Sequence, residues 1–229
     1  MESLSIIKID QNYTSLSETF PAQETCRTTA SVSLEMGGLA MKFAKVERAP
    51  RYDDEHKEND VEHSYMLALL ANELALMHYP EMNAGKVTQF SIVHDLIETV
   101  NGDVPTFTFT AEQMAQKQSL EHEALEELLL TLPPHTARLV YEYEQQQTIE
   151  ARFVKAVDKL LPVVVDILGS GKKVMKEVYG VTTAEQLKAS HDRLHDRIAM
   201  SFEEFPLIVG AHNSLCRLFQ EEFEPVATR

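Results

Sequence analysis

The sequence predicts an all-α fold, a bundle of helices joined by short loops. Apolar residues recur at helical spacing along most of the chain, as in Leu67, Leu70 and Leu74. Capping residues and prolines mark the ends of such runs, and one run lies between Asn59 and Pro80. No alternation typical of strands stands out, and no repeat of about 20–50 residues is present.

These signals divide the chain into a short N-terminal segment and one helical domain. Residues 1–30, rich in Ser, Thr and Gln, are expected to be a short strand or loop followed by flexible chain. Residues 31–225 are expected to form a single bundle, in which Pro162 kinks one helix. The expected helices cover about 32–45, 60–79, 84–100, 111–130, 135–146, 149–168, 183–202 and 206–223.

The charge of the chain excludes several classes of partner. Its 229 residues include 21 Lys and Arg against 36 Asp and Glu, a net charge of −15. Such a chain is not expected to bind nucleic acid non-specifically or to be drawn to an anionic membrane. No apolar run reaches about 20 residues and the N-terminus has no secretory pattern, so we expect a cytoplasmic protein. Cys26 and Cys216 are far apart and are expected to be free thiols.

The most informative stretch is Val93-His94-Asp95-Leu96-Ile97-Glu98. On a helix, His94 and Glu98 lie on one face, one turn apart, with Asp95 beside them. The neighbouring residues are strongly apolar, which predicts a core helix. Burying an imidazole and two carboxylates there is costly unless a partner compensates them, and a divalent cation would do so.

Two further polar residues interrupt apolar helical stripes. His63 heads one stripe and Asp158 stands within another. Together with His94 and Asp95 they form a plausible ligand set for one divalent cation, better suited to Mn²⁺, Fe²⁺, Co²⁺, Ni²⁺ or Zn²⁺ than to Ca²⁺, with Mg²⁺ also considered. Four protein ligands leave room for water and substrate, and a water on the metal becomes a nucleophile at neutral pH.

The order of these residues resembles that of the HD-domain metal-dependent phosphohydrolases, most closely the bacterial 5′-deoxynucleotidase branch. The resemblance covers roughly residues 36–168. Its motifs are Val46-x-Arg48, Val61-Glu62-His63-Ser64, His94-Asp95-x-x-Glu98, Gly102-Asp103-x-Pro105 and Val157-Asp158-Lys159-Leu160.

This resemblance implies an HD-domain helical bundle with a role for each matched residue. His63, His94, Asp95 and Asp158 would be the metal ligands. Glu98 would be the acid/base or water-orienting residue, Asp103 an acid that contacts substrate or water, and Arg48 a phosphate contact. The resemblance also favours a nucleotide substrate and a homo-oligomer, with a dimer preferred. The chemistry agrees, because Glu98 lies one turn from His94 and an arginine fork suits phosphate oxygens.

One departure bears on specificity. The monophosphatase branch has a bulky aromatic residue after the arginine, near the sugar, where this chain has Ala49. The choice between deoxyribose and ribose is therefore left open, as are the base, the number of phosphates and the physiological metal. Asp103 also fits plain turn chemistry, and Asp166 is either a partner of the site or without a role in it.

The predicted function is hydrolysis of the 5′-phosphate of (deoxy)nucleoside monophosphates through a metal-activated water. The alternative is a deoxynucleoside triphosphate triphosphohydrolase, in which Lys172 and Lys173 bind extra phosphates; the simpler interpretation of these lysines is a solvated loop. An alternative of another class is a metal-stabilised binding module without catalysis. A di-iron oxygenase would need additional histidine ligands, and none is evident in the pattern.

Overall fold

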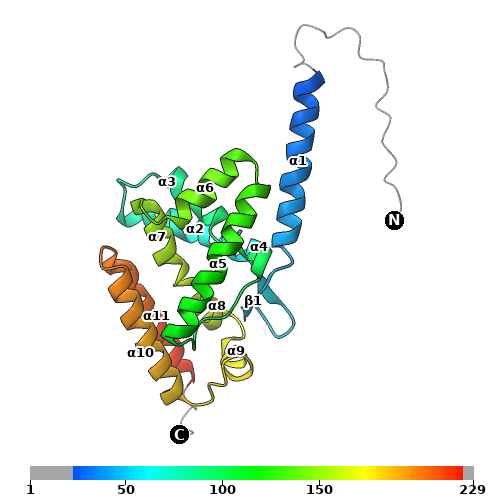
Figure 1. Ribbon diagram of the computed structural model, residues 1–229. Coiled ribbons are helices and arrows are strands. Elements are labelled where there is room, and N and C mark those ends of the chain that lie inside the picture. The colour runs from blue at the N-terminus through cyan, green and yellow to red at the C-terminus, as the bar shows by residue number, and fades with distance from the viewer. Residues whose placement is uncertain (1–22, 224–229) are drawn as a thin grey trace. The chain divides into compact units, whose positions relative to one another are not determined.

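The computed structural model describes residues 23–223, and it divides the chain into two compact units, residues 1–38 and 39–229. Helix α1 (Gln23–Phe43) carries the described part of the first unit (Figure 1). It begins at Gln23 rather than near Val32, so residues 23–30 are helical rather than irregular. The expectation for residues 1–22 falls outside the described part of the chain.

The second unit is helical, which confirms the predicted all-α class. Helices α2 and α3 pack against each other, α6 and α7 pack on α3, and α10 lies along α11 (Figure 1). The helices of this unit are α2 (Asp60–His78), α3 (Ala84–Val93), α4 (Glu98–Asn101), α5 (Ala111–Thr131), α6 (Pro134–Glu144), α7 (Ile149–Asp158), α8 (Leu161–Leu168), α9 (Gly171–Glu177), α10 (Ala184–Ser201) and α11 (Pro206–Phe223). The core between them includes Leu67, Phe90, Phe153, Val154 and Phe205.

Local sequence explains where several helices begin. The sequence spacing of Asn59 to Glu62 and of Thr110 to Gln113 predicts capping boxes, and the structure forms both, at α2 and α5. The spacing of Thr182 to Glu185 predicts another box at α10, but this box forms one residue later, with Thr183 and Gln186. No helix within residues 23–223 combines the length and apolar character needed to cross a bilayer.

Two helices that the sequence predicts as continuous are divided in the structure. The helix expected over 84–100 ends at Val93, and the next turn has hydrogen bonds that span three residues, such as Glu98 N–H to the Asp95 carbonyl at 2.9 Å. The helix expected over 149–168 ends at Asp158 and restarts as α8, with Pro162 in its first turn. Pro162 therefore begins a new helix instead of kinking one, because its missing N–H costs nothing in a first turn.

A two-stranded antiparallel hairpin was not predicted. Strand β1 (Glu47–Arg51) pairs with β2 (Lys57–Asn59). Pro50 indicates a helix end in the sequence, but an edge strand also tolerates a proline. The hairpin contacts α8 and α9, and the Ser170 N–H donates to the Arg51 carbonyl at 3.0 Å.

Gly171 allows α9 to lie directly against α8. A Cβ at this position would stand 2.4 Å from the carbonyl oxygen and 2.5 Å from the Cα of Asp166. We therefore expect Gly171→Ala to lower the free energy of unfolding by about 1–3 kcal/mol, because backbone must move to relieve the contact. Urea denaturation measures this change. Gly210→Ala in α11 is the matched control, since a Cβ there meets nothing within 4 Å; an equal loss in both variants would contradict the packing argument.

Candidate metal centre

Four side chains from three parts of the fold meet in one cluster. His63 lies in the first turn of α2, His94 and Asp95 follow the end of α3, and Asp158 is the last residue of α7. One nitrogen or oxygen atom from each lies within 4.8 Å of all the others. His63, His94 and Asp158 are buried, and Asp95 is partly buried. The structure thus brings together the four residues that the sequence singled out as ligands.

The hydrogen bonding of His94 fits a bound cation. Its Nδ1 donates to the Ser91 carbonyl oxygen at 2.9 Å, and a carbonyl can only accept. In the neutral ring, Nε2 therefore carries a lone pair, and it faces Asp95 Oδ2 at 2.9 Å and Asp158 Oδ1 at 3.8 Å. Three electron-pair donors directed at one another in a buried place match what a divalent cation requires of its ligands.

His63 is oriented by a buried acid on the hairpin. Its Nε2 lies 2.9 Å from Asp158 Oδ1, and its Nδ1 lies 3.3 Å from Glu58 Oε2. Burial and the nearby Arg48 lower the pKa of His63, but the adjacent carboxylates of Asp158 and Glu58 outweigh them and raise it to about 9. A carboxylate behind a histidine in this way fixes the ring and raises its basicity as a ligand.

Arg48 on β1 neutralises the acids on the other side of the cluster. Its Nη1 lies 3.0 Å from Asp60 Oδ1, 2.8 Å from Asp95 Oδ2 and 3.6 Å from Glu98 Oε2, and its Nε lies 3.3 Å from Glu58 Oε2. Asp60, Asp95 and Glu98 are also close enough to hold a cation. The Arg48 guanidinium already places a positive charge beside these three acids.

Glu98, beside the cluster, has a strongly raised pKa. It is the first residue of α4 and is buried. Burial, Asp95 and Asp103 raise the pKa of Glu98 to about 11, although Arg48 opposes the change. Burial also raises the pKa of Asp103, again against Arg48. A divalent cation in the cluster would lower the pKa of Glu98, because positive charge favours the carboxylate.

A cavity of about 140 Å³ opens beside the cluster. Gly102, with φ of 74°, ends α4 and turns the chain so that Asp103 lines this cavity. Lys159 also lines it, and its Nζ lies 2.6 Å from Asp158 Oδ2. Besides Asp158, the wall of the cavity includes Arg48, Ala49, Phe107, Asp166, Tyr179 and His191.

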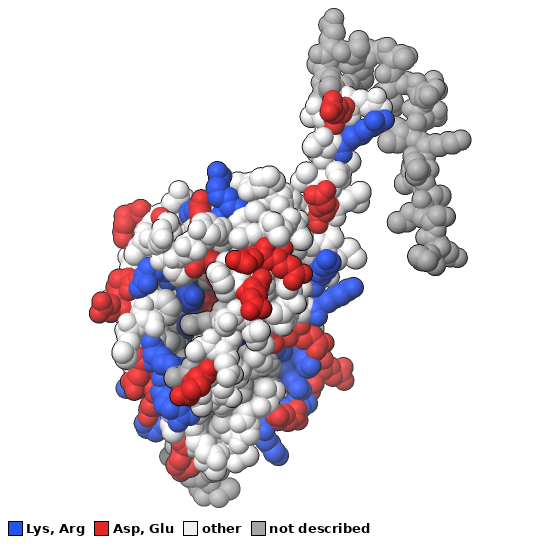
Figure 2. All heavy atoms as spheres, viewed as in Figure 1, with Lys and Arg blue, Asp and Glu red and all other residues white. Residues whose placement is uncertain are grey.

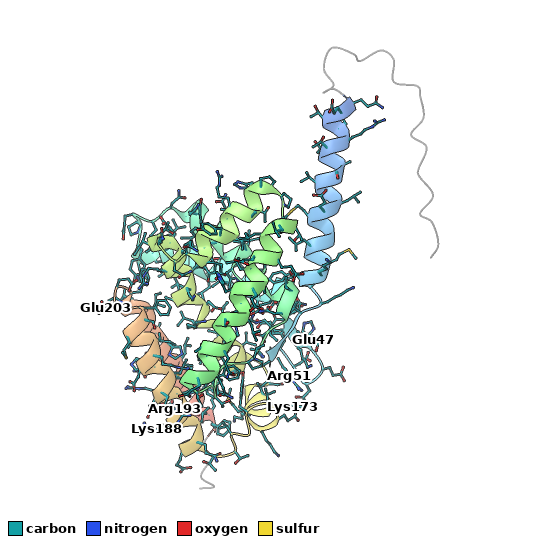
Figure 3. The ribbon with its side chains drawn as sticks, viewed as in Figure 1. Glu47, Arg51, Lys173, Lys188, Arg193 and Glu203 are labelled. Atoms are coloured by element: carbon teal, nitrogen blue, oxygen red, sulfur yellow. The ribbon has the colours of Figure 1, made fainter. Side chains whose placement is uncertain are left out.

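The structure does not place Lys172 and Lys173 at the cluster. They lie in α9, where the sequence analysis expected a loop, and they line a different cavity. Lys173 is labelled on α9 in Figure 3, and its Nζ is 3.3 Å from Asp54 Oδ1. Asp166 lines both cavities, so the lysine-lined space adjoins the one at the metal cluster.

Glu58 and Asp60 are site residues that the sequence analysis missed. Both have a relative exposure of 0 %. They lie in the charged stretch 53–60, which looks like a solvated loop in the sequence. The available signal was position, because this run directly precedes the capped helix that carries His63.

Removal of bound metal is expected to destabilise the protein. Without a cation, the buried lone pairs and carboxylates of the cluster are poorly compensated. A ligand at 100 times its dissociation constant adds about 2.7 kcal/mol, so Mn²⁺ or Co²⁺ should raise Tm by about 5–10 °C over the chelator-treated protein. Calorimetric scans with and without metal test this, and an unchanged Tm with every metal would contradict a bound cation.

Comparison with known proteins gives the family. A family model described as an HD domain matches residues 41–201, most of the chain. The chain belongs to the HD-domain family. This finding confirms the resemblance that the His and Asp pattern predicted.

Several relatives of this HD-domain protein have known names. It is 32 % identical over 109 residues to a 5′-deoxynucleotidase of Xenopus laevis, covering 46 % of this chain and 52 % of the relative. It is 27 % identical over 172 residues to a 5′-deoxynucleotidase of Vibrio vulnificus, covering 69 % and 89 %. The matched region thus spans about half the length of the Xenopus relative.

A solved structure shares the fold. It is described as a predicted metal-dependent phosphohydrolase from Magnetospirillum magnetotacticum, with a TM-score of 0.63 and 25 % identity. The match covers 89 % of this chain and 96 % of the other.

Proposed function

We propose that this HD-domain protein is a metal-dependent phosphohydrolase that removes the 5′-phosphate of (deoxy)nucleoside monophosphates. The observation that carries the proposal is a cluster of potential metal ligands with an arginine and a buried acid beside it, next to one cavity. The ligands are His63, His94, Asp95 and Asp158, the arginine is Arg48 and the acid is Glu98. The names of the relatives in Xenopus and Vibrio support the substrate class.

The four clustered residues would hold one divalent cation. When bound, that cation supplies a Lewis acid for the phosphoryl group and lowers the pKa of a water. Its identity among Mn²⁺, Co²⁺, Fe²⁺, Ni²⁺, Zn²⁺ and Mg²⁺ remains a prediction for experiment.

Arg48 would bind the substrate phosphate. Its Nη1 and Nε lie next to carboxylates. Its Nη2 takes part in no ion pair or hydrogen bond found within residues 23–223. Because Arg48 lines the cavity, this nitrogen is available to a phosphate oxygen. The surrounding acids raise the pKa of Arg48 further, so its charge is permanent.

Glu98 would transfer the proton of the reaction, and Asp103 would have an orienting role. Glu98, near Arg48 and Asp95, would take a proton from the attacking water as a carboxylate and give it to the leaving oxygen of the nucleoside. Asp103, on the cavity wall, would orient the water or the substrate. Arg48 would counter the negative charge that develops on the phosphoryl oxygens.

Phosphate release from a nucleotide panel tests the proposal. The panel contains ribo- and deoxynucleoside mono-, di- and triphosphates, with each metal added after chelator treatment. Turnover of monophosphates supports the proposal. Release of triphosphate or pyrophosphate from triphosphates alone would replace it with a triphosphohydrolase and give Lys172 and Lys173 a role. Metal-loaded protein that is inactive on the whole panel would indicate a binding module.

Acidic and basic side chains are interspersed on the face of the molecule that Figure 2 shows. The homo-oligomer and the cytoplasmic location remain predictions. Analytical ultracentrifugation of the full chain would test for the dimer, and fractionation of the source cells would test the location.

A further inference from the structure

Asp166 is a buried acid that the proposed chemistry does not use. It lies in α8 with a relative exposure of 7 %. Its Oδ1 is buried without a hydrogen-bond partner, and no cation of the described chain pairs with either oxygen. The charged group that influences the pKa of Asp166 is Glu58, which is another acid. Buried polar atoms are nearly always satisfied, so an unpaired carboxylate requires an explanation.

The position of Asp166 is held by backbone packing. Gly171 lets α9 approach the Asp166 backbone closely, and a Cβ at Gly169 would stand 2.1 Å from the Arg51 carbonyl oxygen. Ser170 N–H donates to that same carbonyl. Figure 3 shows Arg51 and Lys173 near each other, where β1 meets α9. Asp166 is thus fixed relative to the hairpin that carries Arg48.

Asp166 lines the same cavity as the metal cluster and Arg48. Arg48 and Asp158 mark the phosphate side of this cavity. Lys159 also lines it but is paired with Asp158, so it does not neutralise Asp166. A substrate held by its phosphate at Arg48 would extend its nucleoside into the remaining space.

The cavity also offers aromatic surface. The ring centroid of Phe107 lies 5.0 Å from that of Tyr179 and 5.7 Å from that of His191. All three residues line the cavity. Aromatic faces bind nucleobases by stacking without selecting among them, so discrimination requires a polar group. Asp166 supplies such a group, a buried carboxylate in this wall whose Oδ1 has no hydrogen-bond partner among residues 23–223.

We infer that Asp166 is a specificity residue that accepts a hydrogen bond from the nucleoside part of the substrate. The donor is an N–H group of the base or a hydroxyl group of the sugar. Ala49 lines the same cavity and leaves room for this contact. The inference rests on the proposed nucleotide substrate and adds the side chain that recognises its nucleoside part.

Steady-state kinetics of Asp166→Ala and Asp166→Asn test the inference. A hydrogen bond to a charged group corresponds to roughly a 10- to 100-fold change, so we expect KM to rise by that factor in Asp166→Ala while kcat changes little. Asp166→Asn keeps the size and one acceptor oxygen and is expected to lose less. Asp192→Asn, an exposed acid on α10, is the matched control and should leave both parameters unchanged.

The substrate series separates the two possible donors. Deoxyribose 5-phosphate has no base, and 2′,3′-dideoxynucleotides lack the sugar hydroxyl groups. A base contact predicts that the KM effect of Asp166→Ala disappears with deoxyribose 5-phosphate. A sugar contact predicts that it disappears with the dideoxynucleotides. Unchanged KM values, or an equal rise for every substrate, would overturn the inference.

A binding measurement keeps this test separate from the proposed function. If the wild type hydrolyses no nucleotide, the proposed function fails, but titration calorimetry with deoxynucleosides still decides the role of Asp166. A 10- to 100-fold weaker affinity in Asp166→Ala supports the contact. Absence of nucleoside binding to the wild type, or equal binding to both proteins, overturns it.

A stability measurement checks that the variant folds. Burial and then Glu58 raise the pKa of Asp166 to about 7. For an acid with a raised pKa, the stabilising contribution is present below the unfolded value near 4 and is lost as the pH rises through about 7. Asp166→Asn is therefore expected to unfold at a higher temperature than the wild type at pH 8 but not at pH 4. A lower Tm at pH 8 would contradict an unpaired buried acid.

Discussion

Asp95→Asn is expected to lower kcat/KM for nucleotide hydrolysis by roughly 10³-fold or more, because it weakens the metal centre and misplaces its arginine. The Asp95 carboxylate lies 2.9 Å from His94 Nε2 and 2.8 Å from Arg48 Nη1. Burial opposes the charged form of Asp95, but His94, when its ring is protonated in the metal-free protein, and Arg48 hold the pKa of Asp95 well below its usual range, so the residue is charged in the folded protein. Asparagine keeps the volume but removes that charge.

Titration calorimetry with Mn²⁺ and steady-state kinetics measure the two losses. Metal affinity should fall at least about 100-fold, beyond the upper end of the effect of a residue that only supports a ligand. Asp192→Asn again serves as the control for an Asp to Asn change on the surface. Full hydrolysis by Asp95→Asn would rule out the cluster as the catalytic centre.

Glu98→Gln is expected to lower kcat by about 10²–10⁴-fold with nearly normal metal affinity. Glu98 is not among the four clustered ligands, so glutamine removes proton transfer and leaves the cation site in place. Wild-type activity in Glu98→Gln would mean that another group, such as Asp103, moves the proton.

The same substitution should alter the pH dependence of stability in the metal-free protein. The folded-state pKa of Glu98 is raised from 4.5 to about 11, so its stabilising contribution is lost as the pH rises through this range. Urea unfolding at pH 6 and pH 9 should show a smaller loss of stability in Glu98→Gln than in the wild type. Equal losses would show that another group causes the dependence.

The clustered ligands could be predicted because each breaks an apolar pattern. His63 and Asp158 stand in helical stripes where a core residue is expected, and His94-Asp95 lies among buried apolar neighbours. A helical period identifies which face is buried, so a polar residue on that face is visible in the sequence. Helical spacing also placed Glu98 one turn from His94, and the family resemblance added Arg48, which periodicity alone would not assign.

The remaining features depend on contacts between distant segments. Glu58 and Asp60 are buried only because the hairpin folds over α2, and their charged neighbours hide this in the sequence. Lys172 and Lys173 looked like a basic loop, but Gly171 and the contact with β1 make the segment a helix beside Asp54. The break after Val93 likewise has no glycine or proline to mark it in the sequence.

Asp95 makes two kinds of contact at once, and these contacts couple the binding of cation to the binding of phosphate. It is ion-paired with Arg48 and is also one of the four clustered ligands. A cation that draws on the Asp95 carboxylate weakens its attraction for Arg48 and leaves the guanidinium freer to bind an anion. Cation and phosphate should therefore bind cooperatively, and reciprocity requires each to increase the affinity of the other by the same factor.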